Sequence, residues 1–191
     1  MSRRYIVSDL HLGHKNISKF RNWNDPITGE RYSSDDQSEM LFEKLMQLRK
    51  RDTLFLLGDT AFTEEWNQRL TELPCANVIG ILGNHCTENG LGMDVIKPAY
   101  KALHGLLRYK DTWLSHAPIH PQELRGKVNI HGHTHHFLML EAIDRSIDRN
   151  YINVCADYTG FGPISFEYAL SDEYYQECVK LHEVNKHLQR S

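Results

Sequence analysis

Side chains that can bind metal ions recur directly after short apolar runs of this sequence. Five such clusters follow one another along the chain: Ser8-Asp9-Leu10-His11, Gly58-Asp59, Gly83-Asn84-His85, Ser115-His116 and Gly132-His133-Thr134-His135. An extended Asp-x-His segment turns its first and third side chains to the same side, and a carboxylate with an imidazole suits a borderline divalent ion. A lone histidine is more often a hydrogen-bonded core residue, and Gly-Asp after a strand is often only a turn. The prediction of a metal site therefore depends on the combination of the five clusters.

Together the clusters supply enough oxygen and nitrogen ligands for two metal ions. The predicted ligands are Asp9, His11, Asp59, Asn84, His116, His133 and His135. Two cations about 3.5–4 Å apart share a water, lower its pKa toward neutrality and hold a phosphoryl oxygen for in-line attack. Because Asn84 is neutral, only Asp9 and Asp59 bring negative charge, so the site with two ions and one hydroxide stays positive and attracts a phosphate anion. The predicted chemistry is phosphoester hydrolysis without a covalent protein intermediate.

His85 is the predicted catalytic acid. It directly follows Asn84, so it is placed to face the site without binding a metal ion. As an imidazolium it would stabilise the transition state and protonate the leaving alkoxide. His131 and His136 flank the last cluster, and because the ligand set is complete without them we interpret them as supporting or surface residues.

The apolar runs before the clusters predict the elements that position these residues. Buried strands are expected at residues 5–7, 53–57, 78–82, 112–114 and 128–130, and helices at 38–51, at 64–73 and from Ser171 onward. This alternation predicts an α/β domain, whose functional residues usually lie in loops beyond the carboxyl ends of the strands. The basic residues Arg49, Lys50 and Arg51 are expected at the end of the first long helix, where they complement its dipole.

Length, composition and net charge indicate what kind of protein this is. With 191 residues, 40% hydrophobic and 25% charged, and without an internal repeat, the chain is predicted to form one domain over residues 1–191. No run approaches the ~20 apolar residues of a membrane span, and no signal-peptide pattern opens the chain, so we expect a cytoplasmic protein with no membrane partner. The four cysteines form no Cys-x-x-Cys pair, and the net charge of -3 argues against affinity based on blanket neutralisation of nucleic-acid phosphates.

In this order, the five clusters resemble the motifs of the calcineurin-like metallophosphoesterase superfamily, from Asp9 to His135. The opening segment, residues 9–17, further resembles small bacterial and phage members. The resemblance implies a β-sandwich flanked by α-helices. It implies that Asp9, His11 and His135 hold one ion, that Asn84, His116 and His133 hold the other, and that Asp59 bridges both. Manganese is the ion expected first, with iron, zinc, cobalt and nickel compatible with the same ligands.

The sequence departs from the family pattern at two places. Cys86 stands where many relatives carry an acidic residue after Gly-Asn-His, which leaves open what orients His85; we interpret Cys86 itself as structural. Thr60-Ala61-Phe62 follows Gly-Asp, where protein-phosphatase relatives have an arginine that grips the phosphate. Because a monoester dianion gains more from extra cations than a diester monoanion, this favours phosphodiesters, unless Lys15 or Arg21 compensates.

The polar segment 14–36 leaves the first strand beside the predicted site. It is interpreted either as a substrate-facing lid or as a surface connection pinned by Phe20 and Trp23, and His14 and Lys15 are its best candidates for phosphate contact. The leading hypothesis is a metal-dependent phosphodiesterase acting on a small or nucleotide-type diester. Phosphomonoesterase and nuclease are the enzymatic alternatives; extended nucleic acid is disfavoured because no basic or aromatic track is evident. An inactive metal-binding interaction scaffold is the alternative of another class, and the complete ligand set argues against it. No residue pattern indicates a protein partner.

Overall fold

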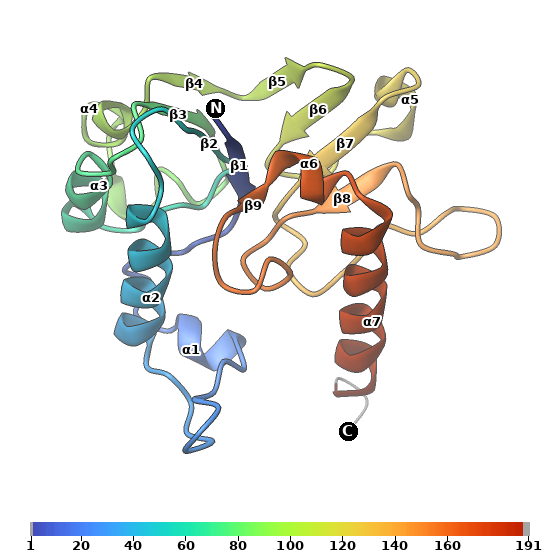
Figure 1. The fold of residues 1–191 in the computed structure, drawn as a ribbon, viewed down its shortest axis with the longest axis horizontal. Coiled ribbons are helices and arrows are strands. Elements are labelled where there is room, and N and C mark those ends of the chain that lie inside the picture. The colour runs from blue at the N-terminus through green and yellow to red at the C-terminus, as the bar shows by residue number, and fades with distance from the viewer. Residues whose placement is uncertain (1, 189–191) are drawn as a thin grey trace.

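Two β-sheets face each other across an apolar core. The computed structural model describes residues 2–188, and Figure 1 shows the sheets with the helices around them. The first sheet has the order β4-β3-β2-β1-β9, with bounds β1 (Arg4–Val7), β2 (Thr53–Leu56), β3 (Asn77–Ile81), β4 (Ala102–His104) and β9 (Ile164–Ser165). The second has the order β5-β6-β7-β8, with bounds β5 (Leu106–Tyr109), β6 (Thr112–Ser115), β7 (Val128–His131) and β8 (Tyr151–Asn153). Strands β1 to β4 pair in parallel, as do β6 to β8, whereas β9 and β5 are antiparallel strands at the sheet edges.

Alternation along the strands divides the core into two clusters. In β2, Leu54 and Leu56 belong to a cluster formed with the helices, whereas Phe55 belongs to a cluster that also contains Leu114 of β6 and Ile130 of β7. Successive side chains of a strand point to opposite faces, so the first sheet packs on helices with one face and on the second sheet with the other. The α/β sandwich implied by the family resemblance is confirmed.

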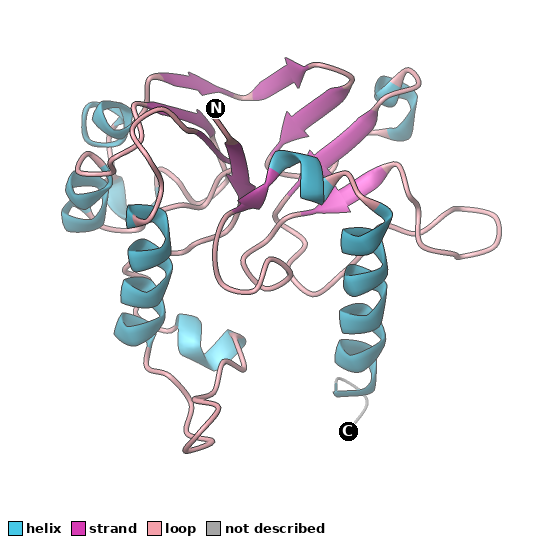
Figure 2. Cartoon of the chain, viewed as in Figure 1, coloured by secondary structure: helices cyan, strands magenta, loops and turns pink. Residues whose placement is uncertain are grey.

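Helices cover the outer face of the first sheet and flank the second. Their bounds are α1 (Ile17–Phe20), α2 (Ser34–Met46), α3 (Glu64–Leu70), α4 (Met93–Ile96), α5 (Pro121–Leu124), α6 (Phe166–Ala169) and α7 (Asp172–Leu188), with short 3-10 turns at Glu88–Gly90 and Lys97–Ala99. Figure 2 shows α2 and α3 on the side of the first sheet away from the second, with α7 beside the second sheet. Within residues 2–188, no helix is long and apolar enough to cross a membrane.

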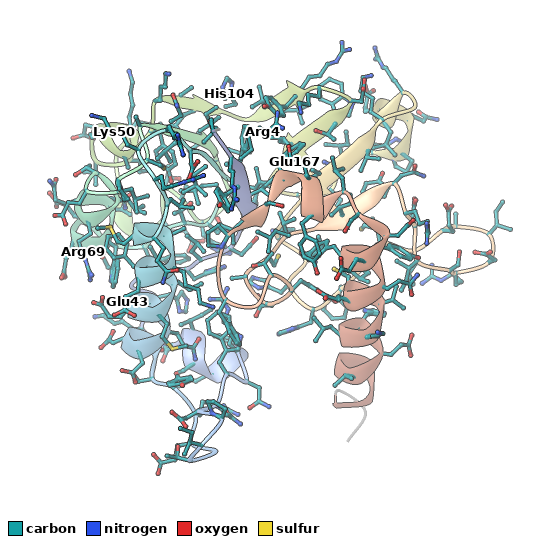
Figure 3. The ribbon with its side chains drawn as sticks, viewed as in Figure 1. Arg4, Glu43, Lys50, Arg69, His104 and Glu167 are labelled. Carbon is teal, nitrogen blue, oxygen red and sulfur yellow. The ribbon has the colours of Figure 1, made fainter. Side chains whose placement is uncertain are left out.

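Ion pairs join several of these elements at the surface. Figure 3 shows Arg4 of β1 beside Glu167 of α6, with which it forms a salt bridge. Arg69 of α3 contacts Glu39 of α2 at 2.6 Å, and its guanidinium lies 4.0 Å from the Trp66 ring centroid. Both arginines are therefore engaged within the chain.

The five strands expected from the apolar runs are confirmed, whereas the expected first long helix was misplaced. Helix α2 begins at Ser34 instead of 38 because Ser33 and Asp36 form a capping box. It ends at Met46 instead of 51, and Arg49 lies in the following turn, where the Asp52 carboxylate accepts hydrogen bonds from its backbone N–H and guanidinium. The predicted placement of residues 49–51 at the helix end was therefore wrong.

The connection expected over residues 14–36 is partly helical. It contains α1 and, from Ser34 on, the first turn of α2. Trp23 is buried and pins the segment as expected, but Phe20 is 68% exposed and does not. The segment is thus tied down at Trp23 while α1 presents an aromatic side chain to solvent.

Candidate metal centre

The loops that follow β1, β2, β3, β6 and β7 converge below the sheets in the view of Figure 1. These loops carry all seven predicted ligands, because the carboxyl ends of parallel strands meet at one edge of a sheet. The structure gathers five of them into two groups whose ligand atoms lie within 4.8 Å of one another: Asp9, His11 and His135, and Asp9, Asp59 and His116.

The first group contains buried polar atoms without a hydrogen-bond partner. Asp9 Oδ1 lies 3.7 Å from His11 Nε2 and 3.7 Å from His135 Nε2. Among the described residues, Asp9 Oδ1 and both ring nitrogens of His11 have no hydrogen-bond partner. Burying such atoms unpaired costs free energy, whereas a cation between them would satisfy the carboxylate and one nitrogen of each imidazole. The donor set therefore fits a divalent metal ion.

The second group shares Asp9 with the first. Asp59 Oδ2 is 3.2 Å from His116 Nε2, which in turn is 2.8 Å from Asn84 Oδ1. The His133 ring centroid lies 5.0 Å from that of His116, but its nitrogens belong to neither group. The residue common to both groups is Asp9, whereas the family resemblance implied Asp59 in the bridging position.

The ligand loops hold their residues in an unusual backbone conformation. Asp9, His11, Asp59, His133 and His135 all have a positive φ, between 43° and 68°. For residues with a Cβ this left-handed region costs about 1–2 kcal/mol each, and such conformations cluster at functional sites. Their concentration in the predicted ligands indicates that the fold is organised around this cluster.

Two glycines of the sequence clusters are required by close approach. A Cβ at Gly83 would overlap the Asp59 side chain and backbone nitrogen, and a Cβ at Gly132 would overlap Ser8 Oγ and Asp9 Oδ2. At Gly132 the loop also turns so that the next residue, His133, donates its backbone N–H to Asp9 Oδ2 at 2.8 Å. Each glycine thus lets one ligand loop lie directly against the carboxylate of another.

A buried ion pair that the sequence analysis missed supports His135. Asp157 Oδ2 lies 2.9 Å from His135 Nδ1, which leaves Nε2 directed toward Asp9. Arg21, 1% exposed, binds Asp157 and the carbonyl oxygens of Asp9 and Leu10. Burial raises the pKa of Asp157, but the Arg21 guanidinium and His135 outweigh it and hold that pKa well below its usual range. A carboxylate on the second nitrogen of a metal-binding histidine orients the ring.

His85, the predicted acid, lies beside the ligands. Its backbone N–H donates to Asp59 Oδ1 at 2.9 Å, and its ring centroid is 6.2 Å from that of His11. Its Nδ1 is 2.5 Å from Glu88 Oε1, so a carboxylate three residues on contacts the ring although Cys86 replaces the acidic neighbour. Cys86 is buried and its Sγ accepts the Gly83 N–H. The sequence analysis did not single out Glu88, because this residue lies outside the Gly83-Asn84-His85 cluster and no pattern links it to His85.

Two adjoining hollows open beside this cluster. One, of about 420 Å³, is lined by His11, His14, Ile17, Phe20, Arg21, His85, His135 and His136. The other, of about 430 Å³, shares His14 and is lined by Lys15, Phe62 and Glu88 among others. Of the predicted substrate contacts, His14 therefore borders the hollow that contains predicted ligands, whereas Lys15 lines only the neighbouring hollow.

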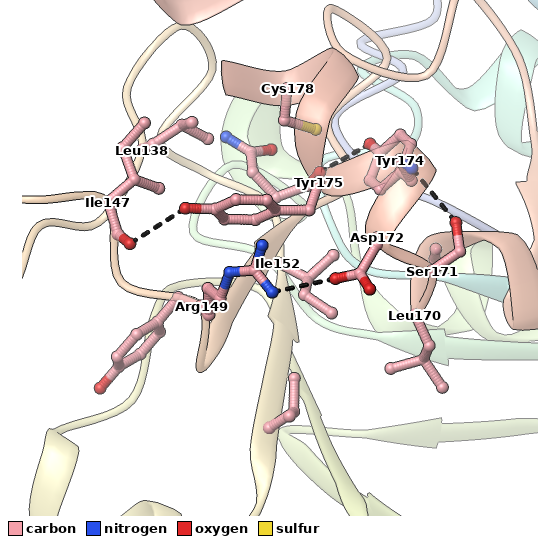
Figure 4. Close-up of a pocket in the computed structure, with 14 residues that line it drawn as sticks. Leu138, Ile147, Arg149, Ile152, Leu170, Ser171, Asp172, Tyr174, Tyr175 and Cys178 are labelled. Atoms are coloured by element: carbon pink, nitrogen blue, oxygen red, sulfur yellow. Dashed lines mark hydrogen bonds and ion pairs between the residues drawn. The ribbon is translucent and has the colours of Figure 1, made fainter.

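A third cavity lies away from the predicted site residues. Figure 4 shows it between β8 and α7, with Tyr175 and the Arg149–Asp172 ion pair at its wall. It has a volume of about 170 Å³, and no predicted ligand lines it.

The two histidines that flank the last ligand cluster differ in burial. His131, interpreted as supporting or surface, is fully buried, and burial lowers its pKa to about 4. His136 is half-buried at the edge of the hollow that His85 and His135 line.

Comparisons with known proteins bear on the family and the fold of this chain. The family model of the calcineurin-like phosphoesterases matches residues 2–151, which include all seven predicted ligands and His85 but not Asp157. The Gene 66 protein of Mycobacterium phage L5 is 28% identical over 199 residues, covering 84% of this chain and 89% of that protein. The crystal structure of a protein of unknown function from Aquifex aeolicus has a TM-score of 0.62 and 20% identity, covering 88% of this chain and 97% of the other. That structure shows a shared fold alone.

Proposed function

The chain belongs to the calcineurin-like phosphoesterase family, and from this premise we propose that it is a phosphodiesterase with two divalent metal ions and His85 as general acid. The family and the ligand groups support a metal-dependent phosphoester hydrolase. The observation that carries the proposal is the convergence of two ligand groups on Asp9, with buried oxygen and nitrogen atoms left unpaired.

The residues of the chain divide the work of hydrolysis. Asp9, His11 and His135 would hold one ion, and Asp59, His116 and Asn84 would surround the other, with His133 beside them. When bound, the ions would lower the pKa of a shared water and neutralise charge on the phosphoryl oxygens. His85 would donate its proton to the leaving oxygen, and Glu88, in contact with Nδ1, would hold the ring in place. Manganese is the proposed ion, by resemblance to the family and because manganese accepts mixed carboxylate, amide and imidazole ligands.

Among the described residues that line the hollow beside His85, no arginine is free to clamp a phosphate, and this supports a diester substrate. Arg21 lines the hollow beside His85, and its guanidinium is buried against Asp157 and two backbone carbonyls. The Arg21 guanidinium is therefore not available to bind a phosphate. A small or nucleotide-type diester, with one negative charge, needs such a clamp less than a monoester dianion does. Lys15, at the neighbouring hollow, would be the residue to serve a monoester.

The test compares hydrolysis of a chromogenic phosphodiester with that of the matching monoester by the manganese-loaded protein. His85→Ala should lower turnover of a diester with an alkoxide leaving group about 10²–10⁴-fold without loss of metal. The alkoxide is needed because a nitrophenolate leaves without a proton and does not report the acid. Asp59→Asn should lose metal and activity together. His104→Ala, on the edge strand β4, is the matched histidine control and should behave like the natural chain.

Three results would overturn parts of the proposal. Dominant monoester turnover would assign a phosphomonoesterase. Unchanged turnover of the diester with the alkoxide leaving group in His85→Ala would remove His85 as the acid. No turnover with manganese, iron, zinc, cobalt or nickel would favour a metal-binding scaffold.

A further inference from the structure

Phe20 is an aromatic side chain exposed to solvent at the edge of the metal cluster. Its side chain is 68% exposed, and it lines the same hollow as His11, His85 and His135. A single exposed aromatic residue needs no explanation on an ordinary surface. In the wall of a hollow that contains the candidate catalytic residue, it offers a flat apolar face to whatever occupies that hollow.

A series of rings leads from the metal ligands to Phe20. The His14 ring centroid lies 5.9 Å from that of His11 and 6.3 Å from that of Phe20, with both pairs edge-to-face. Ile17, one turn earlier on α1, is buried and forms part of the same wall. The hollow therefore has a polar end at the metal ligands and a more apolar end at α1.

The charges around the apolar end select the kind of group that would bind there. The Arg21 guanidinium turns inward to Asp157, so it presents no cation to the hollow. The polar groups beside Phe20 are the imidazoles of His14 and His136, the latter with Nε2 3.5 Å from the Phe20 carbonyl oxygen. A flat, uncharged ring with hydrogen-bonding edges matches these surfaces better than an alkyl chain or a second phosphate.

We propose that Phe20, with Ile17 and the flanking imidazoles of His14 and His136, forms a subsite that stacks against the nucleobase of a nucleotide-type phosphodiester. The proposal rests on the proposed phosphodiesterase function and names the substrate class within it. Phe20 acts as a specificity-determining residue, because stacking on an aromatic side chain favours esters that carry a base over esters that do not.

The experiment uses two diesters with the same leaving group: thymidine 5′-(p-nitrophenyl) phosphate and methyl p-nitrophenyl phosphate. Stacking of one base is worth about 1–3 kcal/mol. Phe20→Ala should therefore lower the ratio of kcat/KM for the thymidine diester to that for the methyl diester about ten-fold, and Phe20→Trp should restore it. Phe137→Ala removes another exposed aromatic ring, 57% exposed and outside the lining of the hollow, and should leave the ratio unchanged. A ratio unaltered by Phe20→Ala, or lowered equally by Phe137→Ala, overturns the subsite.

A binding measurement separates failure of the subsite from failure of the proposed function. Calorimetric titration with thymidine 5′-monophosphate needs no turnover, and Phe20→Ala should weaken its affinity about ten-fold. If neither diester is hydrolysed but this loss is found, the phosphodiesterase proposal fails and the subsite stands. Equal affinities in the natural chain and in Phe20→Ala overturn the subsite whether or not the diesters are hydrolysed.

Discussion

The buried pair of Arg21 and Asp157 makes the substitution Asp157→Asn informative, because it acts on stability and on metal binding by separate routes. The paired side chains are 1% and 2% exposed, and the Arg21 Nε lies 3.2 Å from Asp157 Oδ1. Removing one partner of a buried ion pair typically costs about 3–5 kcal/mol, because the other charge stays buried. For a chain of this size that corresponds to a melting temperature lower by roughly 6–20 °C. Asparagine still offers one acceptor to Arg21, so we expect the lower part of this range.

The same substitution should weaken metal binding through His135. Loss of the carboxylate on Nδ1 removes the group that orients the ring toward Asp9, and such supporting partners are typically worth 10–100-fold in metal affinity. In a His135→Ala background, Asp157→Asn should add little further loss of manganese affinity, since the ring through which it acts is gone.

Two assays measure these effects. Thermal unfolding with a chelator reports the stability of the metal-free chain, and calorimetric titration of manganese well below the melting temperature reports affinity. Asp111→Asn is the matched control, because its ion pair with Lys127 spans 3.7 Å and its side chain is 97% exposed; both quantities should stay as in the natural chain. An unchanged melting temperature in Asp157→Asn refutes the buried-pair reasoning, and an unchanged affinity refutes the orientation of His135.

Three further predictions follow from the backbone, the buried imidazole and the thiols. His133 has a φ of 68°, so the metal-free His133→Gly chain should be about 1 kcal/mol more stable than His133→Ala, as read from urea unfolding; equal stabilities would show that this conformation carries no strain. Burial lowers the pKa of His131 to about 4. Between pH 6.5 and 4, His131 is therefore protonated in the unfolded chain but stays neutral in the folded chain. The free energy of unfolding should fall by about 3 kcal/mol as the pH drops through this range. In His131→Gln, the free energy of unfolding measured from pH 7 to 4 should depend less steeply on pH. The same pH dependence in the variant and in the natural chain would contradict this prediction. All four cysteines are buried, and burial raises the pKa of the Cys178 thiol to about 12, so a thiol reagent at pH 8 should label them only in urea; rapid labelling of the folded chain would be against this.

The sequence was sufficient to predict the strands that carry the ligands, because apolar runs followed by polar residues have a local signature. Asp9 and Asp59 could be assigned to one site since parallel strands end at the same edge of a sheet. The strands β4, β8 and β9 were missed because they have only three, three and two residues, and β9 pairs with β1 from the far end of the chain. Strand β5 is as long as β1, but its side chains alternate between exposed and half-buried, so it contains no buried apolar run.

The supporting contacts could not be predicted, because they join distant parts of the chain. Arg21 and Asp157 are 136 residues apart, and in sequence the arginine belongs to a polar connection that is typical of a surface. Asp157 stands next to Ala156 in a segment without a motif, so its contact with His135 has no local signal. The exposure of Phe20 could not be predicted either, because it depends on how α1 packs against the rest of the chain.

The measurement that tests the dinuclear centre most directly is the manganese content of the natural chain and of two variants at the ligand groups. Asp9 belongs to both groups of ligand atoms, whereas His135 belongs to one. We predict two bound ions and diester hydrolysis for the natural chain, one ion for His135→Ala, and neither ions nor hydrolysis for Asp9→Asn. A natural chain that binds no divalent metal, or an Asp9→Asn chain that keeps both ions and its activity, would contradict the account.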